Sequence, residues 1–270
     1  MLKHLGEHGI KYLTNTFNIC LQSLEIPDMW KQGKIIPIPK PGKPSNQGSS
    51  YRPITLLSPV VKILEATILP FLKDHIPLHE HQHGFRAGHS TTTALCEIST
   101  FITEGLNSTR PAQRSILVAL DLSKAFDMVD HAILLKDIYD TTLPNTIKRW
   151  LANYMSGRQS YVEFRGSKSK PRINKQGVPQ GGVLSPLLFN LYVSKMPLPQ
   201  SNIKLVTYVD DTTILAKSND IKTACDALNM FLPELHSFFQ AATFKFLKPN
   251  RRPPCSHRGR RKLIRNWTST

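Results

Sequence analysis

The sequence predicts an α+β fold, a mixed α/β arrangement in which short strands and helices alternate irregularly. Three observations lead to this prediction. Apolar residues recur at helical spacing in several segments, continuous apolar runs of strand length separate them, and the connecting turns are rich in glycine and proline. The chain has 270 residues, 40% of them hydrophobic, which is enough for one large or two small domains with a sizeable core.

The first half is predicted to contain three amphipathic helices and two extended segments. The helices are expected at about residues 2–25, 59–73 and 91–107. The extended segments flank a basic loop rich in Pro, Gly and Ser, in the stretch WKQGKIIPIPKPGKPSNQGSSYRPITLL. Pro27 is expected to close the first helix, and the second continues its helical period despite Pro70.

The second half begins with the clearest unit. A continuous apolar run, Ile116 to Leu120, predicts a strand that passes through Asp121 directly into a helix with apolar positions at 126, 129, 133 and 134. The next predicted elements are a helix at about 144–156, the extended segment SYVEFRG, a glycine-rich turn opening into an apolar helix in GVPQGGVLSPLLFNLYV, the hairpin KLVTYVDDTTILA, and a helix at about 219–239. Periodicity stops after about residue 243.

Charge and cysteine usage narrow the function classes. The chain has 35 basic and 19 acidic residues, a formal net charge of +16, which favours a polyanionic partner such as nucleic acid over the alternative of simple solubility. The four cysteines are far apart, which argues against a zinc site or a disulfide framework and favours a reducing intracellular compartment. No apolar run approaches the length of a membrane span, so no membrane association is expected.

Three carboxylates stand at the ends of predicted strands. Asp121 ends one apolar strand, and Asp210 and Asp211 lie at the tip of the predicted hairpin. Taken singly, Asp210 and Asp211 fit a solvated turn, and Asp121 fits the N-cap of the following helix. If the strands are neighbours, the three like charges meet at one edge of a sheet and repel one another. A magnesium ion, which prefers oxygen ligands, would remove this repulsion.

Six motifs then resemble those of a known family. ALDLSKAFDMVDH, GVPQGGVLSPLLFN and YVDD, in that order, resemble the three central motifs of reverse transcriptases. WKQGKIIPIPKPGK, YRPITLLSPVVKILE and HGFRAGHST resemble the fingers motifs of the non-LTR, LINE-type retrotransposon branch, of the jockey or R1 kind. The resemblance covers about residues 13–240 and implies the fingers and palm of a right-hand polymerase, the palm being an antiparallel sheet backed by helices.

The resemblance implies RNA-directed DNA synthesis. Asp121, Asp210 and Asp211 would be the catalytic residues and would hold two Mg²⁺ ions, with Mn²⁺ as an alternative, while a primer 3′-hydroxyl attacks a deoxynucleoside triphosphate. The implied partners are an RNA template, a DNA primer and dNTP, with no obligate protein partner evident. A viral-type RNA-dependent RNA polymerase shares the palm carboxylates but usually has an aspartate at the position of Phe126.

The resemblance also implies a nucleotide-binding set. The backbone N–H groups of Lys124 and Ala125, at the turn into a helix, would receive the triphosphate, and Arg52 would bind it with a bidentate guanidinium, with Lys40 as a weaker candidate. Three further roles concern the sugar and the template. Phe126 would exclude a ribose 2′-hydroxyl, Gln180 would contact the sugar, and Gly181 with Gly182 would let the backbone approach the template base. Helical periodicity alone would instead make Phe126 a core residue.

The domain prediction follows these motifs. Residues 1–115 are expected to form the N-terminal helix and fingers, and residues 116–240 the palm, with part of the fingers interleaved at about 137–176. Residues 241–270 are expected to be a disordered or frameshifted basic tail, since nine of the 35 basic residues and no acidic one lie from Lys245 to Thr270. A thumb and an endonuclease region are not expected. A catalytically inactive nucleic-acid-binding remnant or pseudogene product is therefore the alternative function, and nucleus or cytoplasm the expected location.

Overall fold

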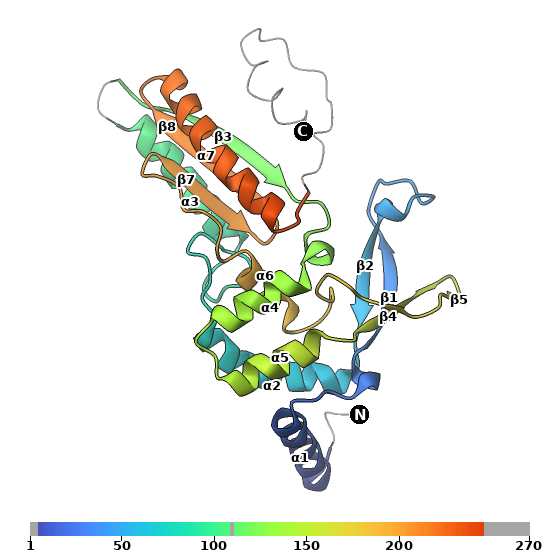
Figure 1. Cartoon of the computed structure of the whole chain (residues 1–270). Coiled ribbons are helices and arrows are strands. Elements are labelled where there is room, and N and C mark those ends of the chain that lie inside the picture. Colours follow the sequence, from blue (N-terminus) through green and yellow to red (C-terminus); the bar gives the residue numbers. More distant parts are fainter. Residues whose placement is uncertain (1–4, 109–110, 246–270) are drawn as a thin grey trace.

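A computed structural model describes residues 5–108 and 111–245 (Figure 1). The elements, in chain order, are α1 (Glu7–Ser23), η2 (Asp28–Trp30), β1 (Gln32–Pro39), η3 (Gly48–Ser50), β2 (Tyr51–Leu56), α2 (Pro59–His75), α3 (Thr91–Leu106), β3 (Arg114–Asp121), η4 (Ala125–Met128), α4 (His131–Asp140), α5 (Asn145–Met155), β4 (Gln159–Phe164), β5 (Ser167–Lys168), β6 (Arg172–Ile173), α6 (Ser185–Tyr192), β7 (Ile203–Tyr208), β8 (Asp211–Ser218) and α7 (Ile221–Ala241). The predicted mixed α/β fold is confirmed.

One sheet, which we name the fingers sheet, has the order β2-β1-β4-β5, and β6 also pairs with β4. β1 is antiparallel to β2, with Lys34 opposite Leu56 and Pro37 opposite Pro53, and it is parallel to β4 from Gln32 to Ile35. Proline cannot donate a ladder hydrogen bond, so it is excluded from strand positions that have neighbours on both sides. Pro37 and Pro39 lie beyond the part of β1 that β4 covers, which explains why this strand tolerates them.

The other sheet, which we name the palm sheet, is antiparallel with the order β3-β8-β7. Helix α7 packs on one face and α3 on the other, as Figure 1 shows. On the α3 face, Ala94 and Phe101 meet Val206 and Leu215 in a small apolar cluster. Helix α7 contributes to the main core on the opposite face. Because both faces are covered, consecutive residues in the middle of β7 (205–207) and of β8 (214–216) are buried, where a sheet with one open face would bury every second residue.

The main core continues from the palm sheet into the helices α2, α4, α5 and α6. Trp150 and Tyr154 of α5 are completely buried and stack on each other, with ring centroids 5.7 Å apart. Both rings are therefore core residues, far from contact with any ligand in solution. The mainly apolar helix α6, which the sequence predicts after the glycine-rich turn, is buried at every position except the partly exposed Pro186.

Two predicted boundaries are wrong. The first helix begins at Glu7, and residues 5 and 6 precede it as irregular chain. The chain after Asp121 does not enter a helix directly: Lys124 has a left-handed backbone (φ 53°), η4 makes a single 3₁₀ turn, and α4 begins only at His131 with Asp130 as its N-cap. The N-cap role considered for Asp121 thus belongs to Asp130. The domain boundaries stay a prediction, and the predicted tail lies outside the described residues from 246 onward.

Candidate active site

The three predicted carboxylates meet at one end of the palm sheet. Asp121 is the last residue of β3 and is directly opposite Asp211, the first residue of β8. Side chains that are directly opposite in an antiparallel pair lie on the same face of the sheet, about 5 Å apart at their Cβ atoms. Asp210 precedes Asp211 in the two-residue turn between β7 and β8. Strand pairing therefore brings together residues that are 90 positions apart in the sequence.

The electrostatics of this cluster are unfavourable for ionised carboxylates. Burial raises the pKa of Asp210 above its usual value, and the neighbouring Asp211 and Asp121 raise it further, against a backbone hydrogen bond that lowers it. Loss of hydration also raises the pKa of Asp121, as does Asp211, whereas Lys40 lowers it. Within residues 5–108 and 111–245, none of the three carboxylates forms a salt bridge. A cation is therefore the partner that their chemistry favours.

The three carboxylates fit a hard divalent ion that also binds water and substrate oxygens. In the described part of the chain, no three His, Cys, Asp or Glu side chains converge closely enough to hold an ion by themselves. Magnesium usually takes one or two protein carboxylates and completes its octahedral shell with water and substrate phosphates. Asp121 and Asp211 on one face, with Asp210 beside them, match this incomplete kind of site better than a closed protein cage.

The turn that carries Asp210 is strained. Val209 has a left-handed backbone with φ 61°. A β-branched residue avoids this region, and such conformations cost on the order of 1–3 kcal/mol each. Strain of this kind persists only where surrounding groups hold the backbone in place. Contacts with the rest of the fold therefore hold the backbone of the hairpin tip in one conformation. The two aspartates alone would instead suggest a freely solvated turn.

The segment predicted to receive the triphosphate lies beside the carboxylates but is not a helix N-terminus. Lys124 and Ala125 stand at the start of the single 3₁₀ turn η4, so the axial dipole of a long helix is missing there. The expected support from a helix end is therefore wrong, although the N–H groups themselves stay candidates. Phe126 is partly buried and stacks on Phe189, with ring centroids 4.6 Å apart. Its predicted contact with the sugar stays a prediction.

The glycine-rich loop before α6 is tied to both the fingers and η4. The backbone N–H of Thr55 in β2 donates to the carbonyl of Gln180, and the Gln180 side-chain amide donates to Asp127 at 2.8 Å. Gly181 has φ 140°, and a Cβ there would lie 2.3 Å from the Thr55 carbonyl oxygen. Within the chain, glycine is thus required at 181 by the close approach of β2, a reason separate from the predicted template contact.

The two predicted basic residues lie on the fingers sheet. Arg52 is exposed on β2, opposite Ile38, and forms no salt bridge within residues 5–108 and 111–245. Lys40 follows β1, donates to the carbonyl of Ser49 at 3.1 Å, and is close enough to Asp121 to lower its pKa. The hairpin β1–β2 therefore places at least one cation near Asp121, and the role of Arg52 in binding the triphosphate stays a prediction.

Sequence reasoning missed three residues that shape this site. Asp127 holds the Gln180 side chain, Thr55 bonds the Gln180 backbone, and Glu65 of α2, fully buried, accepts from the N–H of Val183 and the hydroxyl of Tyr154. Glu65, the acidic residue in the mainly apolar run VVKILEATIL, was the one local signal available, because a buried carboxyl group needs partners. The other two are long-range contacts without a local pattern.

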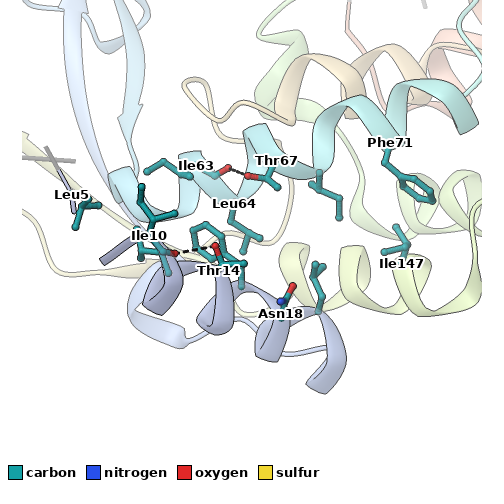
Figure 2. Close-up of a pocket in the computed structure, with 13 residues that line it drawn as sticks. Leu5, Ile10, Thr14, Asn18, Ile63, Leu64, Thr67, Phe71 and Ile147 are labelled. Carbon is teal, nitrogen blue, oxygen red and sulfur yellow. Dashed lines mark hydrogen bonds between the residues drawn. The ribbon is translucent and has the colours of Figure 1, made fainter. Parts of the chain in front are cut away.

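An apolar pocket elsewhere is a weaker candidate for chemistry. Figure 2 shows it between α1, α2 and α5, with a volume of about 520 Å³ and a lining that includes Phe17, Ile68 and Ile147. Its two threonines, Thr14 and Thr67, donate their hydroxyls to carbonyls of their own helices. The pocket lining contains no titratable side chain. The carboxylate cluster is therefore the site to which chemistry is assigned.

Comparisons with known proteins agree with this geometry. A family model described as "Reverse transcriptase (RNA-dependent DNA polymerase)" matches residues 38–248. The chain is 33% identical over 265 residues to the "Probable RNA-directed DNA polymerase from transposon BS" of Drosophila melanogaster, covering 94% of the chain and 29% of that relative. It is 32% identical over 245 residues to the "RNA-directed DNA polymerase from mobile element jockey" of the same species, covering 86% and 26%.

Solved structures share the fold. A telomerase from Candida tropicalis in complex with a fragment of telomeric RNA superposes with a TM-score of 0.55 at 15% identity, covering 88% of this chain and 43% of that one.

The chain spans less than a third of the length of the two Drosophila relatives quoted above. In the described residues, no helix is both long and apolar enough to cross a membrane.

Proposed function

The chain belongs to the reverse transcriptase (RNA-dependent DNA polymerase) family, and from this premise we propose that it catalyses RNA-templated DNA synthesis. The observation that carries the proposal is the register of the palm sheet, in which Asp121 is opposite Asp211 and next to Asp210. The two Drosophila relatives quoted above are named as RNA-directed DNA polymerases from a transposon and from a mobile element. Because the chain spans less than a third of them, its own activity, substrates and partners are proposals.

The proposed reaction is nucleotidyl transfer. The primer 3′-oxygen forms a bond to the α-phosphorus of the dNTP as the bond from that phosphorus to the pyrophosphate oxygen breaks, and the hydroxyl proton leaves to solvent or a nearby base. Two Mg²⁺ ions, or Mn²⁺, would lower the pKa of the 3′-hydroxyl and offset the charge that develops on the leaving oxygen. Asp121, Asp210 and Asp211 would hold these ions, which accounts for a cluster of carboxylates that forms no salt bridge among the described residues.

The remaining residues bind and orient the nucleotide in this proposal. Arg52 offers a free bidentate guanidinium for the triphosphate, and Lys40 adds positive charge between the fingers and Asp121. Gln180 would reach the sugar from the position in which Asp127 now holds it. Phe126, stacked on Phe189, would present its ring edge to the 2′ position of the sugar.

The proposed partners are an RNA template and a DNA primer. The net charge of +16 supports binding to a polyanion, because phosphate contacts release counterions. The three described cysteines are free thiols, which supports a reducing location such as the nucleus or cytoplasm.

Primer extension tests this function. The full chain is incubated with a DNA primer annealed to RNA and each dNTP or rNTP in turn, beside the Asp210→Ala variant. We expect extension with dNTP that depends on divalent metal and is lost in the variant. Phe126→Val should admit rNTP if the ring excludes the 2′-hydroxyl. Equal background from the wild type and Asp210→Ala would refute the proposal and favour an inactive nucleic-acid-binding remnant.

A further inference from the structure

The left-handed backbone of Val209 needs an external restraint, and the structure contains one. The turn between β7 and β8 consists of Val209 and Asp210, so the backbone conformation of Val209 helps to set where the aspartate beside it lies. Isoleucine, valine and threonine carry the largest penalty at positive φ because both branches of the side chain crowd the backbone. Without contacts from elsewhere in the fold, this turn would relax and Asp210 would leave the end of the sheet.

Gln82 contacts the peptide groups on both sides of Val209. Its side-chain Oε1 accepts the N–H of Val209 at 2.9 Å and the N–H of Gly84 at 2.8 Å. Its Nε2 donates to the carbonyl of Val209 at 3.2 Å. Only a primary amide, with an acceptor and a donor on one carbon, satisfies these three groups together. Glutamate lacks the donor, and methionine of similar length has neither function.

The backbone on both sides of Gln82 is itself held in place. Gln82 is 1% exposed and forms a parallel bridge with Thr207 of β7, in which Thr207 N–H donates to His81 and His83 N–H donates to Thr207, both at 2.9 Å. Gly84 lies so close that a Cβ there would be 2.5 Å from the Val209 side chain. The Asn190 amide on α6 donates to the Gly84 carbonyl at 2.9 Å. We name the hydrogen bonds of Gln82 to Val209 the clamp. The backbone that carries the clamp is thus bonded to two separate elements, β7 and α6.

We propose that Gln82 is a positioning residue of the polymerase site. Its side-chain amide fixes Val209 in the left-handed conformation and thereby places Asp210 next to Asp121 and Asp211. Gln82 itself is 1% exposed, and its amide bonds to Val209 and Gly84. The effect on turnover rests on the proposed function, whereas the hydrogen bonds to Val209 do not.

Two variants of Gln82 separate positioning from packing. Gln82→Met keeps the volume and removes all three hydrogen bonds, and Gln82→Glu keeps the acceptors and removes the donor. We expect Gln82→Met to lower kcat for dNTP addition by roughly 10- to 100-fold with KM for dNTP changed by less than about threefold, since displaced catalytic groups slow chemistry more than binding. Hydrogen exchange at the Val209 and Gly84 amides should become fast in the same variant. If Gln82→Met does not fold, Gln82→Glu serves in its place.

Combining Gln82→Met with Val209→Gly tests whether the loss of kcat comes from strain at Val209. Glycine adopts positive φ without strain, so Val209→Gly removes the need for a restraint. The loss of kcat caused by Gln82→Met should shrink to less than about threefold when measured within the Val209→Gly background. Asn153→Leu is the matched control, because Asn153 also accepts a backbone N–H, from Ile26 at 3.0 Å, outside the palm. It should leave kcat per folded molecule unchanged.

The outcomes are distinct. A Val209 amide that exchanges freely in the wild type, or that keeps its protection in Gln82→Met, overturns the clamp. An equal loss of kcat in both backgrounds overturns the positioning role. If the wild-type chain shows no polymerase activity, the proposed function fails, and the exchange of the Val209 amide still decides whether the clamp exists.

Discussion

The palm sheet and the fingers sheet differ in how they are covered. In the palm sheet both faces are packed under helices, and Leu205, Ile214 and Leu215 are completely buried. In the fingers sheet large apolar side chains are exposed instead: Ile38 by 45%, Ile54 by 37% and Ile173 by 63%. The palm therefore presents its carboxylates from a rigid framework, whereas the fingers present cations from a surface that has few packing partners.

This difference predicts a division of labour. Groups on the palm sheet should act on the chemical step, because their positions are fixed by packing and by strand register. Groups on the fingers sheet should act mainly on nucleotide binding, because Arg52 and Lys40 stand on an exposed hairpin. Substitutions on the two sheets should therefore differ in their effects on kcat, on KM and on stability.

The largest effect is expected at the palm carboxylates. Asp121→Asn keeps the volume and removes one of the proposed metal ligands, and it should lower kcat by about 10³-fold or more, as removal of a central catalytic group usually does. Single-turnover addition of one dNTP to a primed RNA template measures this. Asp74→Asn, an exposed aspartate at the end of α2, is the control and should be unaffected. Similar rates in both variants would remove Asp121 from the site.

A matched pair of isoleucines tests the difference in packing. Ile214→Ala on β8 empties space in the palm core and should cost about 2–5 kcal/mol of unfolding free energy. Ile54→Ala on β2 removes a side chain that is already 37% exposed and should cost less than about 1 kcal/mol. Urea titration followed by circular dichroism gives both values. Equal costs would mean that the fingers sheet is covered in solution by something that the described residues do not include.

Arg52 tests the binding role of the fingers. Arg52→Ala should raise KM for dNTP by roughly 10- to 100-fold, the equivalent of losing charge-assisted hydrogen bonds of about 1.5–3 kcal/mol. Its unfolding temperature should stay that of the wild type. Arg52→Lys should recover only part of the affinity, because an ammonium cannot bind bidentately. A fall in kcat at unchanged KM would instead assign Arg52 to the chemical step.

The smallest predicted effect concerns stability without metal. A carboxyl whose pKa is raised in the folded state destabilises that state once it is ionised, so stability is lost as pH rises through the folded pKa. Asp210→Asn should therefore be more stable than the wild type at neutral pH, by at most about 1 kcal/mol because the group is partly exposed and screened. The gain should vanish below the ordinary aspartate pKa of 3.8. Thermal unfolding in a chelator, from pH 3 to 7, measures it.

Much of the fold could be predicted because its signals are local. The hairpin around Val209 and Asp210 follows from two apolar runs of strand length, and α2 keeps its period through Pro70. The chain after Asp121 could not be predicted correctly, since the apolar spacing from Phe126 to Leu134 fits a helix as well as it fits the turn that forms. There, the left-handed Lys124 and the Asp130 cap prevail over periodicity.

For the candidate site, the sequence predicts residues but not their arrangement. The motifs name Asp121, Asp210 and Gln180, whereas their arrangement depends on contacts between distant segments. Asp127 holding Gln180, and Gln82 holding Val209, are hydrogen bonds between side chains and groups that no local pattern connects. Such contacts are decided by the packing of the whole fold, so they become visible only in three dimensions.

The effect of Mg²⁺ on the unfolding temperature tests directly whether the palm carboxylates form a divalent-metal site. A ligand that binds only the folded state raises its stability in a saturable way. The unfolding temperature of the wild type should rise with Mg²⁺ and level off, whereas that of the Asp121→Asn/Asp210→Asn variant should start higher and stay constant. An equal rise in both proteins would contradict the claim.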